Sequence, residues 1–376
     1  MFVSDLALSD FRNYAEAVVA FTPGVMVLQG ANGQGKTNLV EAIGYLASFT
    51  SHRVSADTAL VRAGTPGAVV RAKAVTGGRA TVLELEIIAG RANRARINRT
   101  AVKPRELLGY VHCVMFAPED LALVKGDPGE RRRLLDELAV QLNPRLADPR
   151  ARYDHVLRQR AALLKSMRIR RYPDDVAMLD VWDQQLADLA AQLHAARADV
   201  VENLSPHVRS AYAFLAPGGH ADLELRTSLQ REEESADVAD TSLADRYLQA
   251  LAAARPREIE RGVCLVGPHR DELHLTINEL PARGYASHGE SWSLALALRL
   301  GSFELLRAQL EDSPILILDD VFAELDTARR IKLAELAKQA EQVFVTAAVA
   351  EDVPPQLTHV TYRVAHGTIE RAEGGQ

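Results

Sequence analysis

The chain has 376 residues, which is more than one ordinary core holds, so we expect two domains or one domain with a large insertion. A hydrophobic content of 47% excludes general disorder, and no run approaches the roughly 20 apolar residues of a membrane span. A net charge of −6 means that any case for binding a polyanion depends on local charge. Cys113 and Cys264 stand in apolar surroundings typical of buried thiols, which favours a cytoplasmic protein with no membrane association.

The first third of the chain has the pattern of strands. Alternating or continuous apolar runs predict short strands, and glycine turns between several of them indicate an antiparallel meander. A helical pattern interrupts this series at 39–46. The expected strands cover residues 2–8, 17–21, 25–28, 67–75, 81–88, 94–102 and 111–116.

From about residue 119 the apolar residues recur at the spacing of helices. Prolines stand at or near several starts, where the missing N–H costs little. The expected helices cover 130–142, 145–168, 174–203, 205–215 and 243–254, with an acidic loop at 231–240.

Strand character returns in the last third, with expected strands at 263–266, 273–277, 314–318 and 342–346. The last two are continuous apolar runs, typical of central parallel strands. A helical lid or arm domain over 119–259 is therefore expected to interrupt a head domain formed by 1–118 and 260–376.

A complete phosphate-binding loop follows the apolar run at 25–28 and precedes the helical pattern. It reads Gly30, Ala31, Asn32, Gly33, Gln34, Gly35, Lys36 and Thr37. Glycines let the backbone N–H groups converge on one anion, and the helix N-terminus adds its partial positive charge. Lys36 supplies a charge for the β- and γ-phosphates and Thr37 a hydroxyl for Mg²⁺, so the sequence predicts ATP and Mg²⁺ as cofactors.

The second half of the nucleotide site is expected at the end of the strand at 314–318. Asp319 follows that strand directly, as the Mg²⁺-binding carboxylate of such ATPases does. Asp320 is the candidate to orient or deprotonate the attacking water. A solvated acidic turn is the alternative for this pair.

The spacing of these elements favours an ABC-type ATPase with an inserted lid. Thr37 and Asp319 are 319 − 37 = 282 residues apart, farther than in small kinases or GTPases. A Ser-x-Gly-Glu sequence, with Ser287, Gly289 and Glu290, lies 319 − 289 = 30 residues before Asp319, where ABC ATPases place the signature that closes the partner's site. Thr346, at the end of the next strand, is the candidate γ-phosphate sensor. The predicted fold class is thus α/β: an ABC-type P-loop ATPase head, with a mixed sheet, helices and an antiparallel β lobe, interrupted by an α-helical lid.

Several segments, in this order, resemble the RecF family of ABC-type DNA repair ATPases, which are related to SMC proteins. They are residues 8–14, 30–37, 116–121, 126–128, 131–136, 267–272 and 318–326. The resemblance implies an ATP-dependent homodimer that clamps gapped DNA at single-strand/double-strand junctions. It further implies work with RecO and RecR in loading RecA, a contribution to the SOS response, and slow ATP hydrolysis stimulated by DNA.

Glu290 departs from that family's usual Gln, and a carboxylate cannot donate a hydrogen bond as an amide does. Asp320 stands where most ABC ATPases have Glu. Arg12 and Asn13 lie near the loop in related ATPases, where contact with nucleotide and stabilisation of a turn are both open. The resemblance includes 267–272, and chemistry alone assigns this segment no role.

Two basic islands are the candidate DNA contacts. Residues 145–171 contain nine Lys or Arg against two acids, and residues 91–105 contain six and no acid. Ordinary solvated surfaces are the alternative, and neither island has the aromatic residues of a base-reading surface, so contact with the DNA backbone is expected. The candidate side chains are Arg158, Arg160, Lys165, Arg168, Arg170, Arg171, Arg94 and Arg96.

Two other functions compete. A nucleotide-binding subunit of an ABC transporter needs a much shorter spacing between loop and signature. A metabolic P-loop kinase needs an acceptor site, which no part of the sequence supplies.

Overall fold

The structure is a computed structural model that describes residues 1–54, 56–170, 172, 174–229, 241–310, 312–357 and 359–372. The chain divides into two compact units. The head unit comprises Met1–Val124, His207–Gly219 and Ser287–Gln376, and the lid unit comprises Lys125–Pro206 and His220–Ala286. Compared with the domain boundaries expected from the sequence, the lid unit gains 260–286 and lacks 119–124 and 207–219.

The head unit contains a six-stranded antiparallel sheet in the order β2-β1-β4-β5-β6-β7. The strands are β1 (Phe2–Phe11), β2 (Tyr14–Ala20), β4 (Gly67–Thr76), β5 (Arg79–Ile88), β6 (Arg94–Ile97) and β7 (Thr100–Val102). Alternate residues of β1 and β4, such as Leu6, Leu8 and Val70, are buried, as the period of a half-buried strand requires. The expected meander is confirmed.

A second six-stranded sheet of the head unit has the order β15-β14-β3-β13-β12-β8. Its strands are β3 (Gly24–Gln29), β8 (Cys113–Phe116), β12 (Ile315–Asp319), β13 (Gln342–Ala347), β14 (His359–Ala365) and β15 (Thr368–Arg371). β14, β3, β13, β12 and β8 run parallel, while β15 is antiparallel to β14. Every residue of β12 and β13 is buried, so the central parallel strands predicted at 314–318 and 342–346 are confirmed. β14 and β15 were not anticipated.

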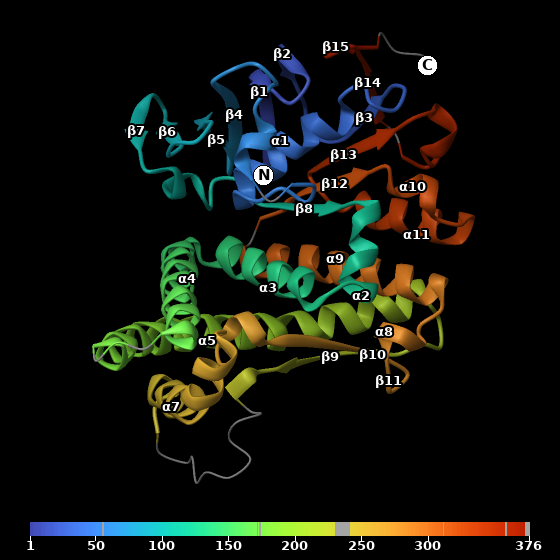
Figure 1. The fold of residues 1–376 in the computed structure, drawn as a ribbon. Helices are drawn as coiled ribbons and strands as arrows, with labels where there is room; N and C mark the ends of the chain where they lie inside the picture. Colours follow the sequence, from blue (N-terminus) through green and yellow to red (C-terminus); the bar gives the residue numbers. More distant parts are fainter. Residues whose placement is uncertain are drawn as a thin grey trace. The chain divides into compact units, whose positions relative to one another are not determined.

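Helix α1 (Lys36–Ser48) follows the phosphate loop and shares one hydrophobic core with both sheets (Figure 1). Helix α9 (His288–Leu310) packs against β8 and is buried at every residue from Ser291 to Leu298. Gly301 of α9 lies against the end of α5, where a Cβ would stand 2.6 Å from Val208 Cγ2. The helix that begins at the signature is therefore held firmly inside the head unit.

The lid unit is built from helices and a small sheet in the order β11-β10-β9. Its elements are α3 (Pro128–Leu142), α4 (Ala147–Ile169), the part of α5 (Asp175–Leu215) up to Pro206, β9 (Ala221–Arg226), α7 (Leu243–Arg261), β10 (Glu272–Ile277) and β11 (Leu280–Pro281). The helices predicted at 174–203 and 205–215 form the single helix α5, with Pro206 inside it.

Two further features of the lid unit differ from the sequence prediction. The prediction of a strand at 263–266 is wrong, because these residues form a bend between α7 and a short turn. Strand β9 was not anticipated. The acidic loop predicted at 231–240 lies outside the described residues.

The segment 267–272 is the centre of the lid unit's polar packing. The Pro268 carbonyl accepts a 2.6 Å hydrogen bond from Arg197 Nη1 of α5, and the fully buried Asp271 accepts one from the Ser228 N–H at 3.1 Å. His269 and Tyr153 of α4 are 2.7 Å apart. The segment, whose role the sequence left open, thus ties α4 and α5 to the end of β9.

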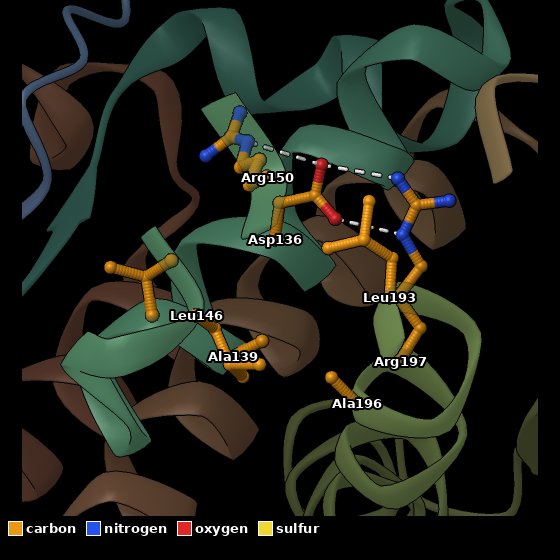
Figure 2. A pocket seen from close by; sticks show the side chains of 8 residues that line it. Asp136, Ala139, Leu146, Arg150, Leu193, Ala196 and Arg197 are labelled. Carbon is orange, nitrogen blue, oxygen red and sulfur yellow. Dashed lines mark hydrogen bonds and ion pairs between the residues drawn. The ribbon is translucent and has the colours of Figure 1, made fainter. Parts of the chain in front are cut away.

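Asp136 of α3 holds two arginines beside a small cavity of the lid unit. Its carboxylate lies 2.7 Å from Arg197 Nε and 3.5 Å from Arg150 Nε (Figure 2). Apolar side chains, including Leu146 and Leu193, line the remainder. With a volume of about 10 Å³, the cavity has room for one water molecule rather than a ligand.

Candidate functional site

The phosphate loop has the backbone that its glycines predict. Gly33 and Gly35 have φ values of 80° and 115°, which side chains disfavour. A Cβ on Gly35 would also stand 2.7 Å from Asn13 Nδ2 and 2.8 Å from the Tyr14 hydroxyl. Gly35 is the N-cap of α1, so the loop leads directly into the N-terminus of that helix. An anion is favoured at this position.

Lys36 is only 3% exposed and its ammonium lies inside the loop. Nζ donates to the Gly30 carbonyl at 2.7 Å and to the Ala31 carbonyl at 3.3 Å, and lies 3.4 Å from Asn32 Oδ1. The charge therefore faces the concave side on which the backbone N–H groups of a phosphate loop converge.

The β1–β2 turn supports the loop from outside. Asn13 Nδ2 donates to the Gln34 carbonyl at 3.0 Å, and the Tyr14 hydroxyl donates to the Gly35 carbonyl at 2.9 Å. Arg12 adopts a left-handed φ of 54° and forms a bidentate pair with the buried Glu41 of α1, with N–O distances of 2.8 and 2.6 Å. The turn thus has a structural role beside the loop.

Thr37, Asp319 and Thr346 meet at the carboxyl end of the parallel strands. The Thr37 hydroxyl donates to Asp319 Oδ1 at 2.9 Å, and the Thr346 hydroxyl donates to the same oxygen at 2.7 Å. Thr346 Oγ1 also accepts the Asp320 N–H at 2.9 Å, so one hydroxyl connects the two aspartates. Residues 282 positions apart in sequence are in this way brought into direct contact.

The oxygen atoms of Thr37 and Asp319 fit the ligand preference of a magnesium ion. Burial raises the pKa of Asp319 to about 6, and hydrogen bonds from Thr346 and Thr37 oppose that rise. A buried carboxylate of this kind is stabilised as an anion by a divalent cation. Mg²⁺ prefers hard oxygen ligands and usually takes one or two from protein, the remainder coming from phosphates and water. Thr37 and Asp319 supply such a pair.

Asp320 is held in a strained conformation next to this pair. Its φ of 50° lies in the left-handed region, where a non-glycine residue is uncommon. As the N-cap of α10 (Val321–Glu324) it turns the chain sharply after β12. Strain of this type persists where surrounding contacts enforce it, and here the Thr346 hydroxyl does so through the Asp320 N–H.

His52 is a residue of this site that sequence reasoning missed. Its Nε2 lies 3.9 Å from Asp319 Oδ2, and that buried nitrogen has no hydrogen-bond partner among the described residues. Burial lowers the pKa of His52, which favours the neutral imidazole despite the nearby Glu41 and Glu119. No motif marks this histidine, because it reaches the site from a loop after α1.

Ser287 and Glu290 form a reciprocal capping box at the start of α9. The Ser287 N–H donates to Glu290 Oε2 at 2.8 Å, and the Glu290 N–H donates to Ser287 Oγ at 3.2 Å. Hydrogen bonds to the Glu290 carboxylate from Ser287, first from its side chain and then from its backbone N–H, lower the pKa of Glu290. The Glu290 side chain acts only as a hydrogen-bond acceptor here, so Glu in place of the family's usual Gln loses no hydrogen bond within the described part of the chain.

The signature residues do not touch their own phosphate loop. No hydrogen bond or ion pair in the described part of the chain joins Ser287, Gly289 or Glu290 to residues 30–37.

The cationic candidates of α4 separate by burial. Arg158, Lys165, Arg168 and Arg170 are exposed. Arg158 and Lys165 are seven residues apart, two turns along one face, opposite a buried stripe. Arg171 lies outside the described residues.

The prediction for Arg160 is wrong. Its side chain is fully buried, with Nε 2.6 Å from Asp183 and Nη2 2.7 Å from Glu258. It is a structural ion pair of the lid core and cannot reach DNA in this fold.

Arg94 and Arg96, on β6, are 74% and 56% exposed but face acids of the neighbouring strand β5. Arg96 is 2.5 Å from Glu84, and Arg94 is 3.8 Å from Glu86. The positive charge of the island at 91–105 is therefore partly offset by residues that a linear count does not include.

The described residues lack two other features. They contain no helix that is both long and apolar enough to cross a bilayer. Nor do they contain a cluster of three or more His, Cys, Asp or Glu that could hold a metal ion.

Comparisons with known proteins agree with this geometry. Residues 2–368 match the family described as RecF/RecN/SMC N terminal domain. The chain is 54% identical to a DNA replication and repair protein RecF of Beutenbergia cavernae and 56% identical to one of Frankia alni, covering 99% of this chain and 100% of each relative. A solved structure described as the recombination mediator protein RecF with ATPrS in the RecFOR pathway superposes with a TM-score of 0.88 at 25% identity, covering 99% of this chain and 98% of that one. The fold is that of an SMC/RecF ABC-type ATPase head, and the chain belongs to the RecF family.

Proposed function

We propose that this chain is an ATP-dependent DNA-binding protein of replication and recombinational repair. ATP joins two copies into a dimer that clamps DNA at single-strand/double-strand junctions, and slow, DNA-stimulated hydrolysis releases it. The observation that carries the proposal is the contact of Thr37, Asp319 and Thr346 beside an intact phosphate loop, with the signature on a helix that does not contact that loop.

Each residue of the site has a role in this function. Lys36 and the loop N–H groups hold the β- and γ-phosphates, while Thr37 and Asp319 would hold Mg²⁺, which supplies charge stabilisation when bound. Asp320, fixed by its strained backbone, orients the attacking water and accepts its proton. Thr346 contacts both aspartates and is placed to transmit the state of the γ-phosphate between them.

The dimer follows from the position of the signature. Ser287 presents a hydroxyl at the N-terminus of α9, a 23-residue helix whose first N–H groups favour an anion. Because it makes no contact with its own loop, we assign its phosphate to the loop of a second copy. ATP then bridges the two chains, and neither site is complete without the other.

The partners are inferred from the family. Solved relatives are named for the RecFOR pathway and the curated relatives for DNA replication and repair. We extend to this chain gapped DNA, RecR and RecO-like proteins as partners, and RecA loading and the SOS response as outcomes, in the cytoplasm. Full-length similarity to RecF proteins disfavours the ABC-transporter alternative.

The exposed cations of α4 are the proposed DNA contacts of the lid unit. Arg158, Lys165 and Arg168 are exposed on α4 and Arg170 follows its end, whereas Arg94 and Arg96 contribute less because each faces an acid. Contacts of this kind neutralise phosphates and carry little sequence information.

Gel filtration and DNA binding, each with and without ATP and Mg²⁺, test the proposal. We expect ATP to convert the chain to a dimer and to raise its affinity for gapped DNA over single strands of equal length. Lys36→Met should abolish both effects by removing the charge on the phosphates. A protein that stays monomeric and ignores DNA with ATP bound would refute the clamp.

A further inference from the structure

Arg329, near the start of α11 (Thr327–Ala337), joins two segments of the head unit that lie far apart in sequence. Its Nε donates to Ser293 Oγ at 3.0 Å and its Nη2 donates to the Gly289 carbonyl at 3.2 Å, both on α9. Its Nη1 pairs with the carboxylate of Asp326, the N-cap of α11. One guanidinium thus links the start of the signature helix to the segment 323–326, which includes the end of α10 and precedes α11.

This link is fixed at both ends. Asp326 also accepts the Arg329 backbone N–H at 2.9 Å, and that bond is the main cause of its lowered pKa. On the other side, a Cβ on Gly289 would stand 3.2 Å from Arg329 Nη2, closer than nearly all real Cβ contacts. Glycine at 289 therefore leaves room for the guanidinium to approach the backbone of the signature.

The contacts of Arg329 lie away from the nucleotide site of its own chain. Within the described part of the chain its hydrogen bonds go to Gly289, Ser293 and Asp326, and none reaches the loop at 30–37 or the carboxylates of Asp319 and Asp320. The arginine is also 24% exposed, so it is not a core element whose loss would unfold the unit.

We propose that Arg329 is a positioning residue of the composite ATP site. It holds the segments 287–290 and 323–326 in one fixed arrangement, so that both reach the nucleotide of the second subunit together. This inference rests on the proposed ATP-dependent dimer. Its specific content is that Arg329 acts in trans, on the site that the other chain's phosphate loop provides.

Single variants give the first test. Arg329→Ala should leave ATP binding by the dilute monomer within about twofold of the wild type, and weaken ATP-dependent dimerisation tenfold or more. Arg329→Lys, which keeps the charge but loses the fork that spans two segments, should restore only part of this loss. Arg307→Ala is the matched control, because Arg307 lies near the far end of α9 and pairs with Glu304 and Gln339.

Mixed dimers of differently labelled chains, followed by fluorescence transfer, give the decisive test. When Arg329→Ala is mixed with Lys36→Met, one site is complete: the Arg329→Ala chain supplies an intact phosphate loop and the Lys36→Met chain supplies an intact signature. ATP should therefore join this pair as well as it joins wild type with Lys36→Met. When both changes are placed on one chain and the partner is wild type, no complete site remains and ATP should not join the pair.

The two mixtures contain the same substitutions and differ only in their distribution. Equal behaviour of the two would overturn the trans role of Arg329, as would lost ATP binding by the Arg329→Ala monomer. Failure of the wild-type chains to dimerise with ATP would instead refute the proposed function.

Discussion

The hydroxyl of Thr346 has one hydrogen and two aspartates within reach. It is 2.7 Å from Asp319 Oδ1 and 3.3 Å from Asp320 Oδ1, while the Asp320 N–H approaches it at 2.9 Å. The hydrogen goes to Asp319 and the oxygen receives the Asp320 N–H, which leaves the Asp320 carboxylate free of that donor. Asp320 thereby keeps its acceptor capacity for a water proton.

Asp320→Asn should separate ATP binding from ATP hydrolysis. The amide keeps the shape of the side chain but cannot take a proton, so we expect turnover to fall about 100-fold or more while ATP still joins two chains. Turnover assays and gel filtration with ATP measure the two effects. Glu335→Gln, an exposed change on α11, is the control, and unchanged turnover in Asp320→Asn would exclude Asp320 as the base.

The loop, Asp319, Asp320 and Thr346, which lie together in the structure, were predicted as one site because each lies at or just after the end of a visible apolar run. Sequence reasoning missed His52, which a loop delivers, and it misplaced Arg160. Basic residues spread along a helix do not show which of them lie on its buried side. Only the acids Asp183 and Glu258, distant in sequence, decide that Arg160 points inward.

At the scale of elements, the 267–272 segment holds the lid unit through a histidine whose tautomer can be deduced. His269 Nε2 lies 3.3 Å from the Cys264 carbonyl, which can only accept, so Nε2 carries the hydrogen. Nδ1 must then accept from the Tyr153 hydroxyl. Protonation of Nδ1 would break that bond, and burial lowers the pKa of His269 to about 4.

The folded lid unit should lose stability in mild acid. Since the unfolded histidine titrates near 6.5 and the folded one near 4, the unfolded chain gains the proton first. The contribution of neutral His269 is full above about pH 6.5 and is lost as the pH falls toward 4, by at most about 3 kcal/mol.

Denaturant unfolding between about pH 7 and pH 5, followed by the fluorescence of Trp182, measures this loss. His269→Gln can make both hydrogen bonds without titrating, so its stability should fall less steeply with pH. His155→Gln, an exposed change on α4, should keep the wild-type slope. Parallel slopes for all three proteins would contradict the assignment.

Helices and strands were predicted correctly where the hydrophobic period of one of them was clear. The wrong predictions have physical causes. Pro206 indicated a helix start, yet α5 continues through it because the flanking residues are well packed, Leu204 and Val208 being fully buried. The apolar run at 263–266 is a bend rather than a strand, in which Cys264 and Val266 are buried while Val263 is exposed. Ser-x-Gly-Glu was interpreted as a signature alone, although Ser287 and Glu290 also have the spacing of a capping box.

At the scale of the whole molecule, local charge decides where the proposed DNA contact can lie, since the chain as a whole is acidic. The α4 face retains exposed cations, whereas Glu84 and Glu86 face those of β6. Arg168 is less suitable for a test than its neighbours, because a Cβ on Gly262 would stand 3.2 Å from Arg168 Cδ and a change there disturbs packing.

Reversing Arg158 and Lys165 to Glu together should weaken DNA binding tenfold or more and reduce the salt dependence of the binding constant by about two in slope. ATP binding and the folded state should stay unchanged. Reversal of Arg226 and Lys338, two exposed cations outside this face, is the control with the same charge change. Equal losses in both double variants would show a non-specific charge effect.

The strand order of the parallel sheet has a consequence for the folding of the protein during its synthesis. β3 lies between β13 and β14, and a Cβ on Gly30 would stand 2.1 Å from the Val364 carbonyl. The phosphate loop is thus shaped by strands that are translated more than 300 residues after it, since 342 − 30 = 312. A nascent chain still lacking residues 342–365 has no partner for either edge of β3, so we expect it to bind nucleotide only after these strands have been made. A ribosome that stalls before them should release a polypeptide unable to bind ATP, which keeps such copies out of the proposed dimer.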